Sequence, residues 1–125
     1  MKQATYILYL EDEREMIDLV GKLLQPYDYK LMGATSGRQG LVMMRERQPD
    51  LILLDLMMYD TNGWDVYRQM KQDEILANIP VIVITAKSLD DDHKIAEDLP
   101  PVDAYVSKPF DPKRLIQAIQ DVLKK

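Results

Sequence analysis

A chain of 125 residues can bury one hydrophobic core but not two, so we expect a single domain over residues 1–125. Hydrophobic residues make up 46% of the chain and charged residues 30%, which is an ordinary globular composition. The sequence has no membrane-spanning run and no secretory signal, so we expect a cytoplasmic protein with no membrane partner. The lack of cysteine excludes disulfides and thiolate catalysis, and a net charge of −5 argues against direct nucleic-acid binding by this segment.

The N-terminal part of the chain predicts a strand followed by a helix. Residues 5–10 are apolar and rich in β-forming side chains, and Glu11, Asp12 and Glu13 end this strand with three carboxylates. Apolar residues then recur at helical spacing between residues 16 and 24, until Pro26 stops the helix. We interpret Glu13 as a favourable acid at the helix start.

A second strand and helix follow. Residues 30–34 favour a weaker strand. Ser36, with Gln39 three residues later, predicts a capping box for a helix that extends to about Arg47, and Pro49 closes this helix.

The centre of the chain is the run of four aliphatic residues 51–54, which ends at Asp55. A continuous apolar run of this length predicts a strand that is covered on both faces, in the middle of a parallel sheet. In open α/β sheets, ligands bind just outside the carboxyl ends of the strands, where the strand order reverses. Asp55 is therefore our first candidate for a functional residue.

The next segments predict a helix, a strand and a short helix. Residues 63–73 favour a third helix. Residues 80–85 form a second continuous apolar strand, entered through a proline at its first position, where proline is tolerated. The acids at 90–92 suit the start of a short helix over residues 90–98, which must end before Pro100.

The C-terminal part predicts a short strand and a final helix. Residues 104–107 form the fifth strand. Asp111 as N-cap and Pro112 at the first helical position open a helix whose apolar stripe runs through residues 115–123.

Strands and helices thus alternate five times. This pattern predicts an α/β fold, a doubly wound, flavodoxin-like parallel sheet of five strands with helices on both faces. The expected strand order is 2-1-3-4-5, which makes the first and third strands neighbours at the switch point.

If the first and third strands are adjacent, Glu11 and Asp12 lie beside Asp55. Three carboxylates at one point repel one another, so such a site either takes up protons or binds a cation. Oxygen ligands select a hard ion, so we predict Mg²⁺, with Mn²⁺ as an alternative.

The fourth and fifth strands bring Thr85 and Lys108 to the same edge of the predicted sheet. A carboxylate such as Asp55 can act as a nucleophile towards phosphorus and form an aspartyl phosphate. That reaction mainly requires that the negative charge on the phosphoryl oxygens is neutralised. A cation, an ammonium group and a hydroxyl can do this.

These residues resemble a known family over essentially the whole chain. The residues at the ends of four predicted strands are similar to those of the receiver domain of two-component response regulators. They are Glu11-Asp12, Asp55, Thr85-Ala86 and Lys108-Pro109. The resemblance implies that Asp55 accepts a phosphoryl group from a phosphohistidine of a sensor histidine kinase or phosphotransfer protein. It further implies that Asp12, Asp55 and the backbone carbonyl of Met57 hold Mg²⁺, with Glu11 assisting through water.

The resemblance also implies roles for the last two strands. Thr85 and Lys108 would bind the phosphoryl oxygens, and a cis peptide would join Lys108 to Pro109. Thr85 and Tyr105 would form a switch, in which the aromatic ring of Tyr105 turns inward when Thr85 moves. An equal alternative is that Tyr105 is a half-buried strand residue with a packing role only and no part in a switch. The face made by residues 90–98, 104–107 and the last helix would carry the output, and a phosphorylation-dependent dimer could form through it.

Three positions depart from the family pattern. Tyr59 stands where receivers often carry proline, Pro100-Pro101-Val102-Asp103 replaces a usual Gly-Ala, and Glu11 replaces an aspartate. The downstream partner stays open, as does the choice between a stand-alone receiver and one domain of a longer regulator.

Two other functions remain as alternatives. A small Mg²⁺-dependent phosphohydrolase would use Asp55 as nucleophile, but position 57 is Met rather than a second aspartate that could act as acid or base. A degenerate receiver used only for docking is disfavoured by the acids, Thr85 and Lys108. We therefore expect no enzyme beyond self-phosphorylation and slow self-dephosphorylation.

Overall fold

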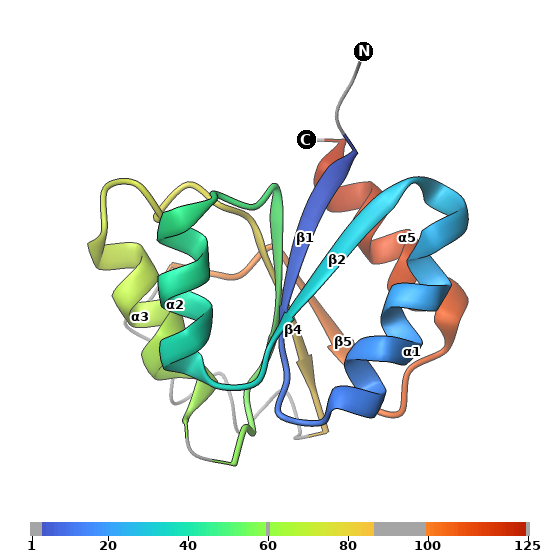
Figure 1. Ribbon diagram of the computed structural model, residues 1–125, viewed down its shortest axis with the longest axis horizontal. Helices are drawn as coiled ribbons and strands as arrows, with labels where there is room; N and C mark the ends of the chain where they lie inside the picture. The colour runs from blue at the N-terminus through green and yellow to red at the C-terminus, as the bar shows by residue number, and fades with distance from the viewer. Residues whose placement is uncertain (1–3, 60, 87–99, 125) are drawn as a thin grey trace.

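The structure is a computed structural model that describes residues 4–59, 61–86 and 100–124 (Figure 1). Its five strands pair in parallel in the order β2-β1-β3-β4-β5, which confirms the predicted sheet. The described elements are β1 (Thr5–Leu10), α1 (Arg14–Leu24), the 3-10 helix η1 (Gln25–Tyr27), β2 (Tyr29–Ala34), α2 (Gly37–Glu46), β3 (Leu51–Asp55), α3 (Gly63–Gln72), β4 (Val81–Thr85), β5 (Ala104–Ser107) and α5 (Pro112–Leu123).

Helices cover both faces of the sheet. In Figure 1, α1 and α5 lie on one side and α2 and α3 on the other. Each face has its own apolar cluster, because alternate residues of a strand point to opposite faces. Every residue of β3 and β4 is buried, which explains why both strands appear in the sequence as unbroken apolar runs.

The predicted helix caps are largely present. The Ser36 hydroxyl accepts the backbone N–H of Gln39 at 3.1 Å. The Gln39 side chain reaches back to the backbone N–H of Thr35 at 2.8 Å rather than to that of Ser36, so the predicted capping box is shifted by one residue on that side. Asp111 accepts the backbone N–H of Lys113 at 3.0 Å and caps α5 as predicted.

Two strand boundaries differ by one residue from the prediction. The strand predicted from residue 30 begins at Tyr29, and the strand predicted from residue 80 begins at Val81. The first helix begins at Arg14, directly after Glu13, which agrees with the interpretation of Glu13 as an acid at the helix start. The helix predicted over residues 90–98 lies outside the described residues. In the described ranges, every helix is too short or too polar to cross a membrane.

Replacing Gly63 with alanine is expected to lower the free energy of unfolding by about 1–3 kcal/mol, as overpacking of a tight site does. A Cβ at this position would lie 2.7 Å from the backbone oxygen of Asp55 and 2.7 Å from the Cα of Leu56, and neither atom can move without shifting β3. Urea denaturation measures the loss.

The matched control is Gly21→Ala within α1, where a Cβ would meet only Leu31 Cδ2 at 3.7 Å. Alanine is the better helix former, so this variant should be as stable as the wild type or up to about 1 kcal/mol more stable. Equal stability of the two variants would contradict the tight packing of Gly63.

Candidate functional site

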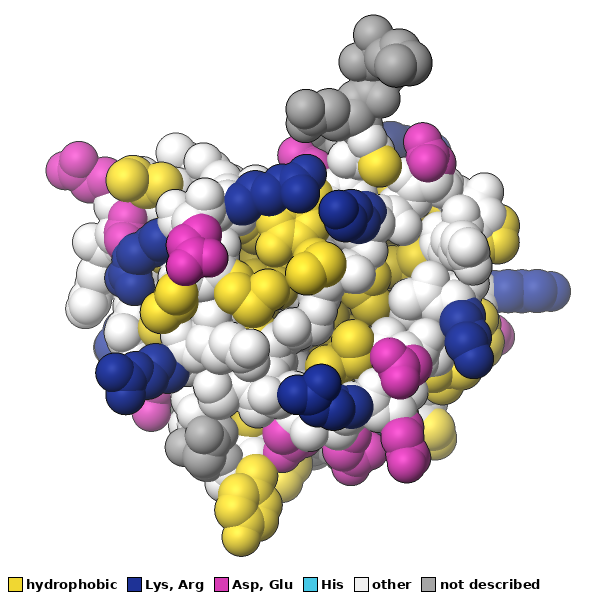
Figure 2. Space-filling model, viewed as in Figure 1, with side chains coloured by type: hydrophobic (Ala, Val, Ile, Leu, Met, Phe, Trp, Pro, Cys, Tyr) yellow, Lys and Arg dark blue, Asp and Glu magenta, His cyan; other side chains and the backbone are white. Residues whose placement is uncertain are grey.

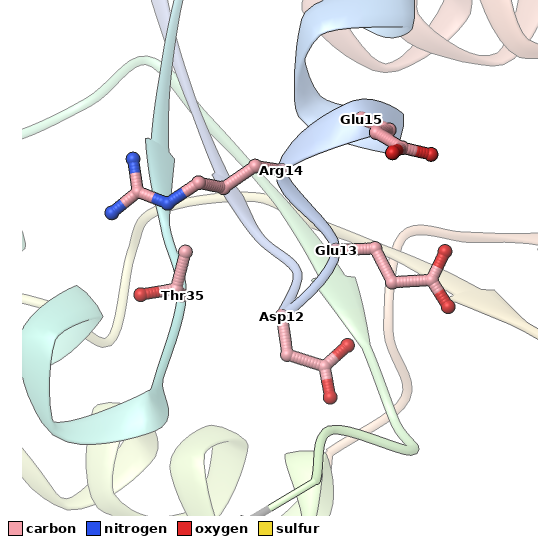
Figure 3. A pocket seen from close by; sticks show the side chains of 5 residues that line it. All are labelled: Asp12, Glu13, Arg14, Glu15 and Thr35. Carbon is pink, nitrogen blue, oxygen red and sulfur yellow. The ribbon is translucent and has the colours of Figure 1, made fainter.

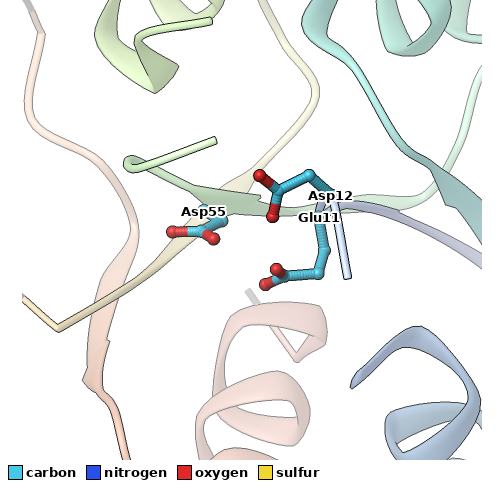
Figure 4. Close-up of side chains that lie close together, drawn as sticks. All are labelled: Glu11, Asp12 and Asp55. Atoms are coloured by element: carbon cyan, nitrogen blue, oxygen red, sulfur yellow. The ribbon is translucent and has the colours of Figure 1, made fainter. Parts of the chain in front are cut away.

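Three carboxylates meet at the carboxyl edge of the sheet. Leu10 of β1 pairs with Leu54 of β3, so Glu11 and Asp55 follow at the same level. Glu11, Asp12 and Asp55 each place a carboxylate oxygen within 4.8 Å of the others, as the strand order predicted (Figure 4). Acidic side chains also gather along this edge, at the bottom of the view in Figure 2.

The three carboxylates differ in exposure. Glu11 is 1% exposed and Asp55 is 4% exposed, whereas Asp12 is half-buried. A pocket of about 560 Å³ opens beside Asp12, between the start of α1 and the end of β2 (Figure 3). It is lined by Asp12, Glu13, Arg14, Glu15 and Thr35. Asp12 therefore connects the buried carboxylates with the surface.

Lys108 bridges the two buried carboxylates. Its Nζ lies 2.6 Å from Glu11 Oε2 and 3.2 Å from Asp55 Oδ2. The backbone N–H of Lys108 donates to the carbonyl of Thr85 at 2.8 Å, and the peptide bond to Pro109 is cis. The ammonium group thus neutralises part of the negative charge at this edge.

The protonation equilibria of this pair follow from burial and charge. Burial raises the pKa of Glu11, the nearby Asp55 charge adds to the rise, and the hydrogen bond from Lys108 opposes it. Burial acts to lower the pKa of Lys108, but the hydrogen bond to Glu11 and the charge of Asp55 outweigh it, so the pKa lies above its ordinary value. Burial of these carboxylates therefore favours a positive charge beside them.

The Lys108 ion pairs predict a pH-dependent stability. A lysine whose pKa is higher in the folded state than in the unfolded state stabilises the fold. The full stabilisation is present below the unfolded pKa of 10.5, and it is lost as the pH rises through the pKa of the folded state. In Mg²⁺-free buffer, Lys108→Met should lower the free energy of unfolding by roughly 2 kcal/mol at neutral pH, less than the loss of a fully buried pair.

Urea denaturation of the wild type and the Lys108→Met variant between about pH 8 and pH 11 measures this difference. The difference should stay constant at first and shrink above the ordinary lysine pKa of 10.5. A difference that grows with rising pH would contradict the assigned pairs.

Thr85 and Tyr105 lie on the strands beyond β3. Asp55 pairs with Ile84, so Thr85 sits one residue further towards the carboxyl edge, and its side chain is fully buried. Tyr105 is half-buried and packs against the apolar cluster on the α2 and α3 face. Thr85 therefore lies on β4, the strand next to that of Asp55, and Tyr105 lies one strand further away, on β5.

The loop after β3 is tied to two of the carboxylates, which the sequence did not predict. The backbone N–H of Met57 donates to Asp55 Oδ1 at 3.0 Å, and that of Tyr59 donates to Asp12 Oδ2 at 2.6 Å. A proline at position 59, common in the family pattern, has no N–H and could not make the second bond. The Tyr59 side chain itself is 97% exposed.

Tyr9 and Glu13 also contact the site. The Tyr9 hydroxyl donates to Glu11 Oε2 at 3.1 Å, and the backbone N–H of Glu13 donates to Glu11 Oε1 at 3.3 Å. Glu13 stands at the N-cap position of α1 and makes no capping bond with its side chain. Tyr9 was missed as a site residue, although a tyrosine two positions before Glu11 on the same strand face was a usable signal.

Comparison with known proteins places the chain in a family. A family model described as the response regulator receiver domain matches residues 7–120. The phosphate regulon transcriptional regulatory protein PhoB of Pseudomonas aeruginosa is 34% identical over 119 residues, which cover 95% of this chain and 52% of PhoB. The response regulator SaeR of Staphylococcus aureus is 33% identical over 119 residues, covering 95% of this chain and 50% of SaeR. The chain therefore spans about half the length of the curated relatives it matches.

Solved structures support the same fold. The signal receiver domain of a signal transduction histidine kinase from Syntrophus aciditrophicus superimposes with a TM-score of 0.86 at 26% identity, covering 97% of this chain and 91% of that chain. The chemotaxis response regulator CheY4 of Vibrio cholerae superimposes with a TM-score of 0.85 at 20% identity, covering 95% and 98% of the two chains. The chain belongs to the response regulator receiver domain family, whose members are signalling modules of two-component systems.

Proposed function

We propose that this receiver domain is a phosphoacceptor and that Asp55 carries the phosphoryl group. The observation that supports the proposal best is the position of Asp55 at the end of β3, 4% exposed, with two carboxylates and the Lys108 ammonium around it. The donor is a phosphohistidine on a sensor histidine kinase or a phosphotransfer protein. This partner class agrees with the response regulators that the chain resembles.

The proposed transfer moves the phosphoryl group directly from nitrogen to oxygen. An Asp55 carboxylate oxygen forms a bond to phosphorus, the phosphorus–nitrogen bond of the phosphohistidine breaks, and the imidazole nitrogen takes up a proton from water. The product is an acyl phosphate. Slow attack by water on phosphorus returns inorganic phosphate and the free Asp55 carboxylate.

The donor set around Asp55 fits a hard divalent cation. Glu11, Asp12 and Asp55 offer oxygen ligands within 4.8 Å of one another, which suits Mg²⁺ or Mn²⁺. We assign Asp12, Asp55 and the backbone carbonyl of Met57 as direct ligands and Glu11 as a ligand through water. A bound Mg²⁺ supplies positive charge to the phosphoryl oxygens.

Thr85 and Lys108 are proposed to hold the phosphoryl oxygens. Thr85 is buried one residue beyond the level of Asp55, and the Lys108 ammonium already lies 3.2 Å from Asp55 Oδ2. Lys108 exchanges its carboxylate partners for the phosphoryl oxygens, a movement that its long, flexible stem permits.

Phosphorylation is proposed to shift a two-state equilibrium on the β5 and α5 face, with Thr85 and Tyr105 as the switch residues. The supporting observations are that Tyr105 is half-buried and that β5 leads directly into Lys108. The output is an attached or separate domain, or a dimer through this face. Amide exchange in residues 104–107 and 112–123 should change on full phosphorylation, and unchanged exchange there would contradict the switch.

The phosphoacceptor role is tested with acetyl phosphate as a small-molecule donor and intact mass spectrometry. With Mg²⁺ present, the wild type should gain one phosphoryl group that is lost in base, and it should gain none when EDTA removes the cation. Mg²⁺ binding without any adduct would point to a docking module or to a receiver that requires its own kinase as the donor. Sustained release of phosphate at many turnovers would point to a phosphohydrolase.

A further inference from the structure

A buried tyrosine lies directly behind the proposed cation site. Tyr9 is fully buried within β1, in the apolar cluster beneath α1 and α5. Residues two apart on a strand point to the same face, so Tyr9 and Glu11 lie on one side of the sheet. The Tyr9 hydroxyl donates to Glu11 Oε2 at 3.1 Å. The apolar surroundings of Tyr9 explain why its ring is buried, but they do not explain its hydroxyl group.

A hydroxyl in such surroundings is costly unless it makes a hydrogen bond. Phenylalanine would fill nearly the same volume and would avoid this cost. The hydrogen bond to Glu11 meets this requirement, and the carboxylate that accepts it is itself only 1% exposed.

The donors around Glu11 differ in what they do to its charge. Lys108 Nζ lies 2.6 Å from Oε2 and neutralises the carboxylate, whereas the Tyr9 phenol is neutral and leaves the charge available to a cation. In the proposed function Lys108 leaves Glu11 for the phosphoryl oxygens. Tyr9 and the backbone N–H of Glu13, at 3.3 Å from Oε1, then remain to hold the carboxylate.

We propose that Tyr9 is a positioning residue that holds Glu11 towards a bound Mg²⁺ while Lys108 changes partners. This inference rests on the proposed phosphoacceptor function and adds to it a residue that acts through Glu11. Hydrogen-bond partners of metal ligands fix the orientation of the ligand in this way, and their loss typically weakens metal binding by 10- to 100-fold. Because Glu11 is assigned to act through water, we expect a loss near the lower limit.

The test is isothermal titration of Mg²⁺ into the wild type and the Tyr9→Phe variant. The variant should bind Mg²⁺ about 10-fold more weakly and should unfold in urea at nearly the wild-type concentration. Tyr6→Phe is the matched control, because Tyr6 lies on the same strand but on the opposite face, with its ring 4.7 Å from the Arg47 guanidinium. This control should bind Mg²⁺ as the wild type does.

A double-mutant cycle with Glu11→Ala separates positioning from packing. If Tyr9 acts through Glu11, Tyr9→Phe should have almost no effect on Mg²⁺ affinity in the Glu11→Ala background. The same loss in both backgrounds, or equal Mg²⁺ affinity of Tyr9→Phe and the wild type, would overturn the inference.

The two proposals fail in different ways. A wild type that binds Mg²⁺ but is phosphorylated neither by acetyl phosphate nor by a phosphohistidine donor overturns the phosphoacceptor function, while the Mg²⁺ affinities still decide the role of Tyr9. A wild type that is phosphorylated, together with a Tyr9→Phe variant of unchanged Mg²⁺ affinity, overturns the role of Tyr9 alone.

Discussion

Asp55→Asn is expected to abolish phosphoryl uptake, so that no adduct is detected by intact mass spectrometry after incubation with acetyl phosphate and Mg²⁺. The substitution keeps the size of the side chain and an oxygen that can accept the backbone N–H of Met57, a bond of 3.0 Å in the structure. It replaces a nucleophilic carboxylate with a neutral amide, which is a poor nucleophile towards phosphorus. The loss is therefore chemical and should leave the fold intact.

The matched control for this variant is Asp65→Asn. Asp65 is an exposed acid in the first turn of α3, so its substitution makes the same chemical change away from the carboxylate cluster. It should be phosphorylated as the wild type is. A phosphoryl adduct on Asp55→Asn with wild-type yield would contradict the assignment of Asp55.

Lys108→Met is expected to have two effects of opposite sign. The rate of phosphorylation should fall by roughly 100-fold, the cost of removing one charged or hydrogen-bonding contact to the transferred group. Mg²⁺ should bind more tightly than to the wild type, because the ammonium that neutralises Glu11 and Asp55, at 2.6 Å and 3.2 Å, is gone.

The phosphorylation rate is measured from reactions quenched at successive times at saturating Mg²⁺. The Mg²⁺ affinity is measured separately by isothermal titration. Lys113→Met, at an exposed position in the first turn of α5, is the control and should change neither quantity. If the phosphorylation rate and the Mg²⁺ affinity of Lys108→Met fall together, Lys108 supports the shape of the site rather than the phosphoryl group.

The sheet could be predicted because its signals are local and repeated. Residues 51–54 and 81–84 are continuous apolar runs, and such runs mark strands that are covered on both faces. Once β1 and β3 are neighbours, the meeting of Glu11 and Asp12 with Asp55 follows from the common direction of parallel strands. The site therefore followed from the topology and not from a single motif.

The details of the hydrogen bonding could not be predicted in the same way. The bond from the Tyr59 backbone to Asp12 depends on the path of a loop, and backbone donors are the same for every residue except proline. Lys108 was expected near the phosphoryl group, but its bridge between Glu11 and Asp55 depends on side-chain torsions that no pattern encodes. The position of Tyr9, two residues before Glu11 on the same strand face, could have marked it as a neighbour of the site, but the hydrogen bond from its hydroxyl is evident only from the structure.

The most direct test of the account locates the phosphoryl group on the chain. After reaction with acetyl phosphate and Mg²⁺, borohydride reduces an aspartyl phosphate to homoserine, which marks the modified residue permanently. Peptide mass spectrometry should then find homoserine at position 55 and at no other acidic position. Homoserine at position 12, or a phosphorylated protein without homoserine at position 55, would contradict the central claim.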